Sequence, residues 1–389
     1  MNHLISSDPT TLSQAYKTEV LSLECTATAR IYKKLCGIKE QLNIGSQSKY
    51  FSDYIVTPRS NNSRMPLYSG TLVHKSDLSF LYYHFKNDDK YFLCSGKQTA
   101  YQDSNAYESF YYQLPSLSTV QHIDISKYGA SIEQQSLVLM SRQQYGHFVY
   151  DDLLPVLSHI LSMPKSYDNL ILLYSCEWQI RATKELISIT GISIRLITIL
   201  LPKFHSILNI QGACFFVPQI PSALFTAFER IKSYSSSLRR LAWPSAIQVR
   251  VAYLSRKGFE IGRPRVVNRE ATIATLNEEY SVTCIQPHEY NERELLTKLS
   301  TYEIAIAEPG TLPLIGGLLT PLSTRLINLL SRRCLLDCEP KYVYSGWRYH
   351  VPFIEQTEYI WCQPCTKEAN PFSDQILVPT EWLKARICL

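Results

Sequence analysis

Short apolar runs separated by helix-length stretches dominate the middle of the chain. They cover residues 136–140, 169–174, 195–200 and 213–217, and they show no polar–apolar alternation. Apolar strands that alternate with helices are typical of a largely parallel sheet covered on both faces. This part of the chain therefore predicts an α/β unit. The irregular, tyrosine-rich region before residue 127 predicts short strands and loops.

The same pattern repeats after a predicted helix over residues 222–241, which ends near Trp243-Pro244. Strands are predicted at 249–255, 281–285, 303–307 and 325–330, and helices at 270–279, 292–299 and 312–319. Asn291 and Glu294 have the spacing of a capping box at the start of one of these helices. Because a single core rarely grows beyond about 250–300 residues, a chain of 389 residues predicts two domains.

We therefore expect two doubly wound α/β domains, residues 1–243 and 244–389, with the C-terminal tail able to pack back on the first. Ligands of such sheets bind beyond the carboxyl ends of the strands. Residues that follow predicted strands are consequently the first candidates for a site.

Composition and charge exclude several classes of protein. The chain has 39 Lys and Arg and 34 Asp and Glu, which gives a formal net charge of only +5. Proteins that bind nucleic acid usually carry a much denser positive charge. The N-terminus lacks the pattern of a secretory signal, and charges, prolines or glycines interrupt the most apolar windows. The sequence therefore predicts a cytoplasmic protein without a transmembrane segment.

The 11 cysteines are an odd number scattered along the chain, which favours reduced thiols. Cys334-x3-Cys338 and Cys362-x2-Cys365 have the spacing of a four-thiolate zinc site. Burial of these cysteines as small apolar side chains is the alternative explanation.

The first candidate site follows the predicted strand at 136–140. On a helix, His147 and Asp151 lie four residues apart on one face, where the carboxylate could orient the imidazole for general-base catalysis. Asp152 lies off that face. In the alternative interpretation, Asp151 or Asp152 is the N-cap of a helix and Pro155 occupies its first turn.

The second candidate site follows the predicted strand at 249–255 and contains several basic residues on a glycine-containing loop before a helix. Arginine side chains bind phosphate oxygens through two parallel hydrogen bonds, and a helix N-terminus adds partial positive charge. A diphosphate is therefore a plausible ligand, and a solvated basic loop is the alternative. The residues are Ser255, Arg256, Lys257, Arg263, Arg265, Asn268 and Arg269.

A third segment, residues 308–313, follows the predicted strand at 303–307. Gly310 permits close approach of the backbone, and the amides around Thr311 would point toward an anion. A tight strand-to-helix turn explains the segment equally well. The chain has no Asp-x-Asp element, by which metal-dependent sugar transferases hold a divalent ion. If a diphosphate is the leaving group of a reaction here, the arginines would have to neutralise its charge without a metal.

Taken in order, these segments resemble family 61 glycosyltransferases. His147, Asp151-Asp152 and Leu153-Leu154-Pro155 match that family's His-x3-Asp-Asp-Leu-Leu-Pro pattern. The family's Ser/Thr-Arg, Arg, Asn and Glu series is matched by Ser255, Arg256, Arg265, Asn268 and Glu270. Pro309-Gly310-Thr311 stands in place of the family's His-Gly-Ala turn, so the usual histidine is missing.

The resemblance implies an inverting, metal-independent glycosyltransferase of GT-B architecture, with two Rossmann-like domains facing a central cleft. In this interpretation the first domain binds a glycan acceptor and the second a nucleotide-sugar co-substrate, expected to be UDP-linked, with no further cofactor. The base would come from His147, Asp151 and Asp152. Donor diphosphate ligands would be Ser255, Arg256, Arg263, Arg265, Gly310 and Thr311, and donor nucleotide ligands Asn268, Pro287, His288, Glu289 and Glu308.

The expected role is extension of a bacterial capsule or lipopolysaccharide glycan, whose lipid-linked acceptor would require only peripheral contact with a membrane. Two other functions are compatible with the sequence. A polysaccharide pyruvyl transferase would use the basic site for phosphoenolpyruvate. A non-catalytic glycan-binding or scaffolding subunit is favoured by the missing histidine at Pro309.

Overall fold

A computed structural model describes the fold of the chain. The described residues are 3–4, 17–25, 65–74, 77–85, 88–95, 99–102, 120–130, 135–141, 144–162, 167–200, 206–211, 213–218, 225–242, 249–258, 264–336, 353, 356–368 and 371–388. Its contacts divide the chain into two compact units. Unit 1 comprises Met1–Glu24 and Pro66–Ala227, and unit 2 comprises Cys25–Met65 and Phe228–Leu389. The domain boundary at 243/244 stays a prediction.

Unit 1 contains a largely antiparallel sheet built from the tyrosine-rich region. Its strand order is β1 (His3–Leu4), β6 (Thr99–Gln102), β5 (Asp88–Ser95), β4 (Asp77–Phe85), β11 (Ser206–Gln211) and β7 (Val120–Ile123). The pairs β6–β5, β5–β4 and β4–β11 are antiparallel, whereas β1 pairs parallel with β6 and β7 pairs parallel with β11 at the two edges.

The second sheet contains the four apolar runs that the sequence pattern predicts as strands. Its order is β10 (Arg195–Leu200), β9 (Asn169–Tyr174), β8 (Ser136–Met140), β12 (Ala213–Pro218), β3 (Met65–His74) and β2 (Lys17–Cys25). The first four are mutually parallel, as predicted, and β3 runs antiparallel to β12. Between β10 and β12 the chain passes through β11 of the other sheet, so the strict strand–helix alternation predicted here is wrong at that step.

Unit 2 is built on one sheet with the order β14 (Ser281–Ile285), β13 (Arg250–Leu254), β15 (Ile304–Ala307), β16 (Arg325–Ser331), β17 (Thr357–Pro364) and β18 (Ile376–Leu377). The strands from β14 to β17 are parallel and β18 is antiparallel. The second strand in sequence, β14, lies outside the first, whereas the third, β15, lies on the other side. The switch in strand order therefore falls between β13 and β15, where such sheets bind ligands.

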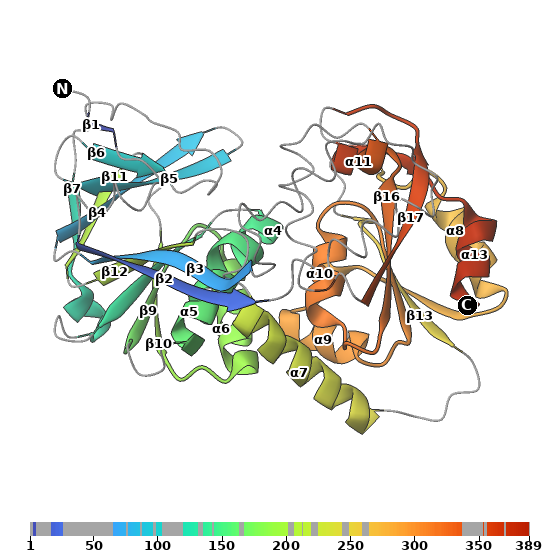
Figure 1. The fold of residues 1–389 in the computed structure, drawn as a ribbon, viewed down its shortest axis with the longest axis horizontal. Coiled ribbons are helices and arrows are strands. Elements are labelled where there is room, and N and C mark those ends of the chain that lie inside the picture. Colours follow the sequence, from blue (N-terminus) through green and yellow to red (C-terminus); the bar gives the residue numbers. More distant parts are fainter. Residues whose placement is uncertain are drawn as a thin grey trace. The chain divides into compact units, whose positions relative to one another are not determined.

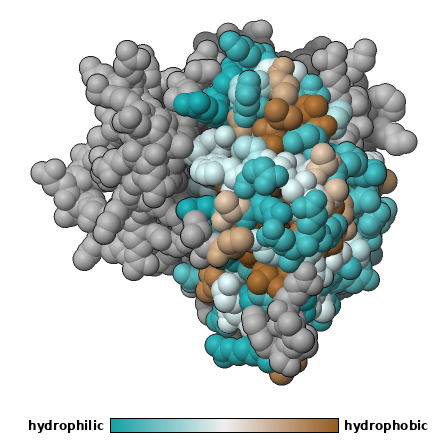
Figure 2. Space-filling model, turned by 90° about the vertical axis from the view of Figure 1, so that its right-hand side faces the viewer, coloured by the Kyte–Doolittle hydropathy of each residue, from teal (hydrophilic) through white to brown (hydrophobic). Residues whose placement is uncertain are grey.

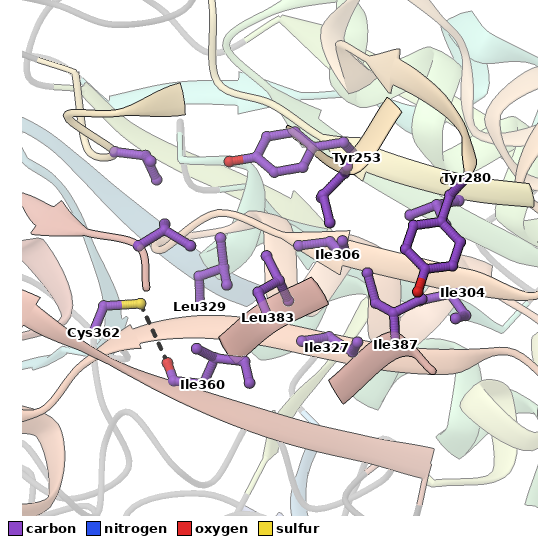
Figure 3. Packing of buried hydrophobic residues seen from close by; sticks show 14 of the residues in the cluster. Tyr253, Tyr280, Ile304, Ile306, Ile327, Leu329, Ile360, Cys362, Leu383 and Ile387 are labelled. Carbon is purple, nitrogen blue, oxygen red and sulfur yellow. Dashed lines mark hydrogen bonds between the residues drawn. The ribbon is translucent and has the colours of Figure 1, made fainter. Parts of the chain in front are cut away.

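Helices cover both faces of this sheet, as the sequence predicts. Figure 1 shows α8 (Arg269–Asn277) and α13 (Thr380–Ile387) on one side and α9 (Glu292–Leu299) and α10 (Leu312–Leu319) on the other. Side chains from α8 and α13 complete a core with the inward residues of β13, β15, β16 and β17 (Figure 3). On the opposite face, Gly316 of α10 leaves no room for a side chain against Leu254 and Leu326.

Buried polar side chains attach α7 (Phe225–Ala242) to the C-terminal end of α10 within unit 2. Lys232 Nζ donates to the carbonyl of Thr320 at 2.6 Å, and Ser235 Oγ donates to the carbonyl of Leu319 at 2.9 Å. Arg239 donates to Thr324 Oγ1 at 2.9 Å. A helix ends with unsatisfied carbonyls, and these donors supply partners where water is excluded. Burial lowers the pKa of Lys232 well below its ordinary value.

Among the described residues on the face shown in Figure 2, hydrophobic residues form small patches between hydrophilic ones. Within the described part of the chain, no helix combines the length and the apolar character needed to cross a membrane.

Candidate functional site

The helix that carries His147 contains a wide, π-helical turn. It begins with α4 (Tyr145–His147), continues through the π-helical residues Phe148–Leu153 and ends with α5 (Leu154–Ser162). Within the wide turn the Leu154 N–H donates to the carbonyl of Val149, five residues back. Pro155 explains the widening, because its ring clashes with the carbonyl four residues earlier and it has no N–H to donate. Such turns are frequent at functional sites.

His147 and Asp151 form the hydrogen bond that their spacing predicts. His147 Nδ1 lies 2.7 Å from Asp151 Oδ2, and the two side chains are 41% and 13% exposed. Since an ionised carboxylate only accepts, Nδ1 donates to Asp151, and in a neutral imidazole the lone pair would then lie on Nε2, the arrangement of an oriented general base. The helix begins at Tyr145 with Gln144 as its N-cap. The alternative in which Asp151 or Asp152 caps the helix is therefore wrong, and Asp152 is buried.

A second histidine on the same helix has a different environment. His159 is fully buried in α5, and its Nε2 lies 2.6 Å from the Tyr167 hydroxyl. Burial lowers the pKa of His159 from 6.5 to about 4. This histidine is therefore neutral at pH 7 and belongs to the core rather than to a solvent-facing site.

The depressed pKa of His159 predicts acid sensitivity. The His159 imidazole takes up a proton near pH 6.5 in the unfolded chain but only near pH 4 in the folded chain. The free energy of unfolding is therefore highest above pH 6.5 and decreases as the pH falls from 6.5 to 4. Relative to His159→Gln, which does not titrate, the wild type should lose about 2–3 kcal/mol between pH 7.5 and 4.5. Urea unfolding of both proteins at the two pH values measures this, and parallel pH dependences would contradict it.

In unit 2 a buried ion pair joins the end of a strand to the start of a helix. Glu308 follows β15, and Arg269 begins α8; their side chains are 0% and 5% exposed. Arg269 donates through Nε to Oε1 and through Nη2 to Oε2, the latter at 2.9 Å. Glu308 Oε2 also accepts the backbone N–H of Arg256, just beyond β13, at 3.0 Å. The carboxylate thus fixes the loops that follow β13 and β15 beside the switch in strand order.

Arg256 lies against Gly310 at this edge of the sheet. Gly310 has φ +103°, and a Cβ there would collide with the Arg256 guanidinium. Arg256 Nε is buried, and no described residue accepts a hydrogen bond from it. A buried cationic donor without an acceptor is costly unless an anion binds it. Arg269 is paired within the fold, whereas the Nε of Arg256 has no acceptor among the described residues.

The neighbouring loop after β14 meets the loop after β13. Gly258 has φ +84°, and a Cβ there would lie 3.1 Å from Gln286 Oε1 and 3.5 Å from His288 Nε2. Pro287 is buried at the start of a short 3-10 helix, whereas His288 and Glu289 are exposed. The structure therefore brings the predicted segments after β13, β14 and β15 together at one edge.

Other predicted donor ligands in unit 2 make mainly internal contacts. Ser255 is buried and its Oγ accepts the N–H of Lys257 at 3.1 Å. Thr311 is the N-cap of α10 and, like Gly310, is partly exposed. Asn268 exchanges two hydrogen bonds of 2.9 Å with the backbone of Val378.

The backbone carbonyl of Arg265 accepts a hydrogen bond of 2.8 Å from the N–H of Ile376. Arg263 lies outside the described residues. The donor-binding role of each of these residues, and of Glu308, stays a prediction.

The proposed zinc ligands are only partly described. Cys334 and Cys362 are buried and Cys365 is exposed, whereas Cys338 lies outside the described residues. Burial raises the pKa of Cys362, which disfavours the thiolate form that binds metal. Among the residues that can be described, no group of three or more His, Cys, Asp or Glu could hold a metal ion.

Fold and geometry together define a mixed α/β protein with polar constellations at the carboxyl ends of its parallel strands. Comparison of the chain with protein-family models gives no match, and comparison with curated proteins gives none either.

Proposed function

We propose that this protein is a metal-independent, inverting glycosyltransferase of GT-B type that transfers a sugar from a nucleotide-sugar donor to a glycan acceptor in polysaccharide synthesis. The observation that carries the proposal is Arg256. Its guanidinium lies against Gly310 at the switch point between β13 and β15, and its buried Nε has no acceptor in the part of the chain that the structure describes. A diphosphate bound there would also meet the N-terminal end of α10.

In this proposal unit 2 stabilises the leaving group. As the bond between the anomeric carbon and the donor phosphate oxygen breaks, negative charge develops on the nucleoside diphosphate. Arg256 and the amides around Gly310-Thr311 would neutralise that charge in a preorganised site. The Arg269–Glu308 pair contributes by fixing the backbone on which Arg256 stands.

His147 and Asp151 supply the complementary chemistry. An acceptor hydroxyl would transfer its proton to His147 Nε2 while its oxygen attacks the anomeric carbon opposite the leaving group. Asp151 holds the imidazole in the required tautomer through the 2.7 Å hydrogen bond to Nδ1 and stabilises the imidazolium that forms.

Ligand-dependent thermal stability tests the proposal, because a ligand that binds only the folded protein raises its melting temperature. UDP, GDP, ADP and phosphoenolpyruvate would be compared with and without EDTA. We expect stabilisation by one nucleoside diphosphate, undiminished by the chelator. Stabilisation by phosphoenolpyruvate alone would instead support a pyruvyl transferase, and no response to any of the four would contradict the proposal.

Replacing Arg256 with alanine should weaken binding of the stabilising nucleotide by about ten- to a hundredfold, because hydrogen bonds to charged groups contribute about 1.5–3 kcal/mol. Isothermal titration calorimetry measures the change. Arg181→Ala, which removes an exposed arginine from α6 (Glu177–Thr190) of unit 1, is the control and should bind as the wild type does. Equal affinity of both variants would exclude Arg256 as a phosphate ligand.

A further inference from the structure

A partly exposed tryptophan is held rigidly beside the His147 helix. Trp178 is the second residue of α6, directly after β9. The next residue, Gln179, is fully buried, and its Oε1 accepts the N–H groups of Ser175 at 2.8 Å and Cys176 at 2.9 Å. These bonds fix the turn between β9 and α6 and thereby the position of Trp178. Ser141 Oγ joins the ends of β8 and β9 by donating to the Leu173 carbonyl at 2.6 Å.

The Trp178 ring contacts the two aromatic residues that flank His147. Its centroid lies 5.4 Å from that of Phe148 at an interplanar angle of 85°, and 5.6 Å from that of Tyr145 at 34°. Phe148 is completely buried and supports the indole edge-to-face. Trp178 and Tyr145 are each partly exposed. The accessible aromatic surface therefore borders the helical turn that carries the His147–Asp151 pair.

We infer that Trp178 and Tyr145 form a carbohydrate subsite, in which a pyranose ring of the acceptor stacks its C–H face on the aromatic surface. This inference rests on the proposed function. A pyranose has apolar faces and hydroxyl groups around its edge, and aromatic side chains offer a broad apolar surface with a polar tip at little conformational cost. Stacking on Trp178 would place hydroxyl groups at the edge of the sugar toward the partly exposed His147. The hydroxyl that His147 deprotonates must come close to this side chain.

Saturation-transfer-difference NMR tests the subsite directly. The probes are the methyl glycosides of β-D-glucose, β-D-galactose, β-D-xylose and N-acetyl-β-D-glucosamine, together with UDP in separate samples. We expect saturation of the ring C–H protons of at least one glycoside by the wild type. Trp178→Ala should lower affinity for that glycoside about tenfold, whereas Trp178→Phe should retain most of it.

Two controls make the result specific. Trp382→Ala removes another partly exposed tryptophan, 50% exposed on α13 of unit 2, and should leave glycoside binding unchanged. An unchanged circular dichroism spectrum and thermal transition of Trp178→Ala would show that this variant is folded, and Trp178→Phe, which keeps an aromatic ring, tests the inference if it is not. Absence of glycoside binding by the wild type, or equal binding by wild type and both Trp178 variants, would overturn the inference.

The same samples separate this inference from the proposed function. Arg256→Ala should lose UDP signals and keep glycoside signals. Glycoside binding that depends on Trp178, without any nucleotide binding, would support the carbohydrate subsite and contradict the proposed glycosyltransferase function. UDP signals that depend on Trp178 would assign the aromatic surface to a nucleobase and overturn the carbohydrate subsite.

Discussion

Replacing Glu308 with glutamine is expected to lower the free energy of unfolding by about 3–5 kcal/mol. The change leaves Arg269 charged at 5% exposure without its anionic partner. It also places an amide where a carboxylate accepts donors from Arg269 and from the Arg256 backbone. Urea unfolding, followed by circular dichroism, measures the loss.

A second glutamate of the same sheet is a matched control. Glu303 also accepts a backbone N–H, from Arg250 at 2.8 Å, and pairs with the Arg250 guanidinium at 3.1 Å. Those side chains are 21% and 24% exposed, so Glu303→Gln should cost only about 1 kcal/mol. Equal losses in the two variants would show that burial of the Arg269–Glu308 pair is not the source of its stabilising effect.

Replacing both members of the buried pair separates the effect of an unpaired charge from the loss of the ion pair itself. A buried ion pair is frequently no more stabilising than apolar residues of similar volume, so Arg269→Met with Glu308→Leu should be more stable than Glu308→Gln alone. The double variant also removes the acceptor for the Arg256 N–H. Weaker nucleotide binding in this stable background would indicate that the pair positions Arg256 in addition to stabilising unit 2.

The elements of unit 2 could be predicted because local signals agree with the fold. The helices predicted at 292–299 and 312–319 are α9 and α10, with the same bounds. Asn291 and Glu294 form the capping box that their spacing indicates, with reciprocal bonds of 2.9 and 3.0 Å. Apolar runs identify β13, β15 and β16 because both faces of these strands are buried, whereas the edge strand β14 is only partly buried.

The candidate sites were predictable only where the contact is local. His147 and Asp151 are four residues apart, so helical geometry alone brings them together. Arg269 and Glu308 are 39 residues apart and meet only because β13 and β15 are neighbours. The contact between Trp178 and Phe148 likewise depends on the pairing of β8 with β9. Pro155 was the single local signal for the wide turn, and a proline is compatible with several other helical irregularities.

Replacing His147 with alanine is expected to reduce turnover by about 10²–10⁴-fold while leaving nucleotide affinity unchanged. The loss follows from the proposed function, in which the acceptor hydroxyl must lose its proton as it attacks. The assay is UDP release from a UDP-sugar, with a glycoside identified by NMR as acceptor. Calorimetry with UDP provides the affinity.

Asp151→Asn separates orientation of the imidazole from the proton transfer itself. Asparagine fills the same volume and can accept a hydrogen bond from Nδ1, but it lacks the charge that stabilises the imidazolium. Asp151→Asn should therefore be slower than the wild type and faster than His147→Ala. If His147→Ala kept full turnover while Asp152→Asn lost it, the base would be Asp152, and the His147–Asp151 hydrogen bond would serve only to hold the wide turn of the helix. Because Asp152 is buried and His147 is 41% exposed, we expect the opposite order.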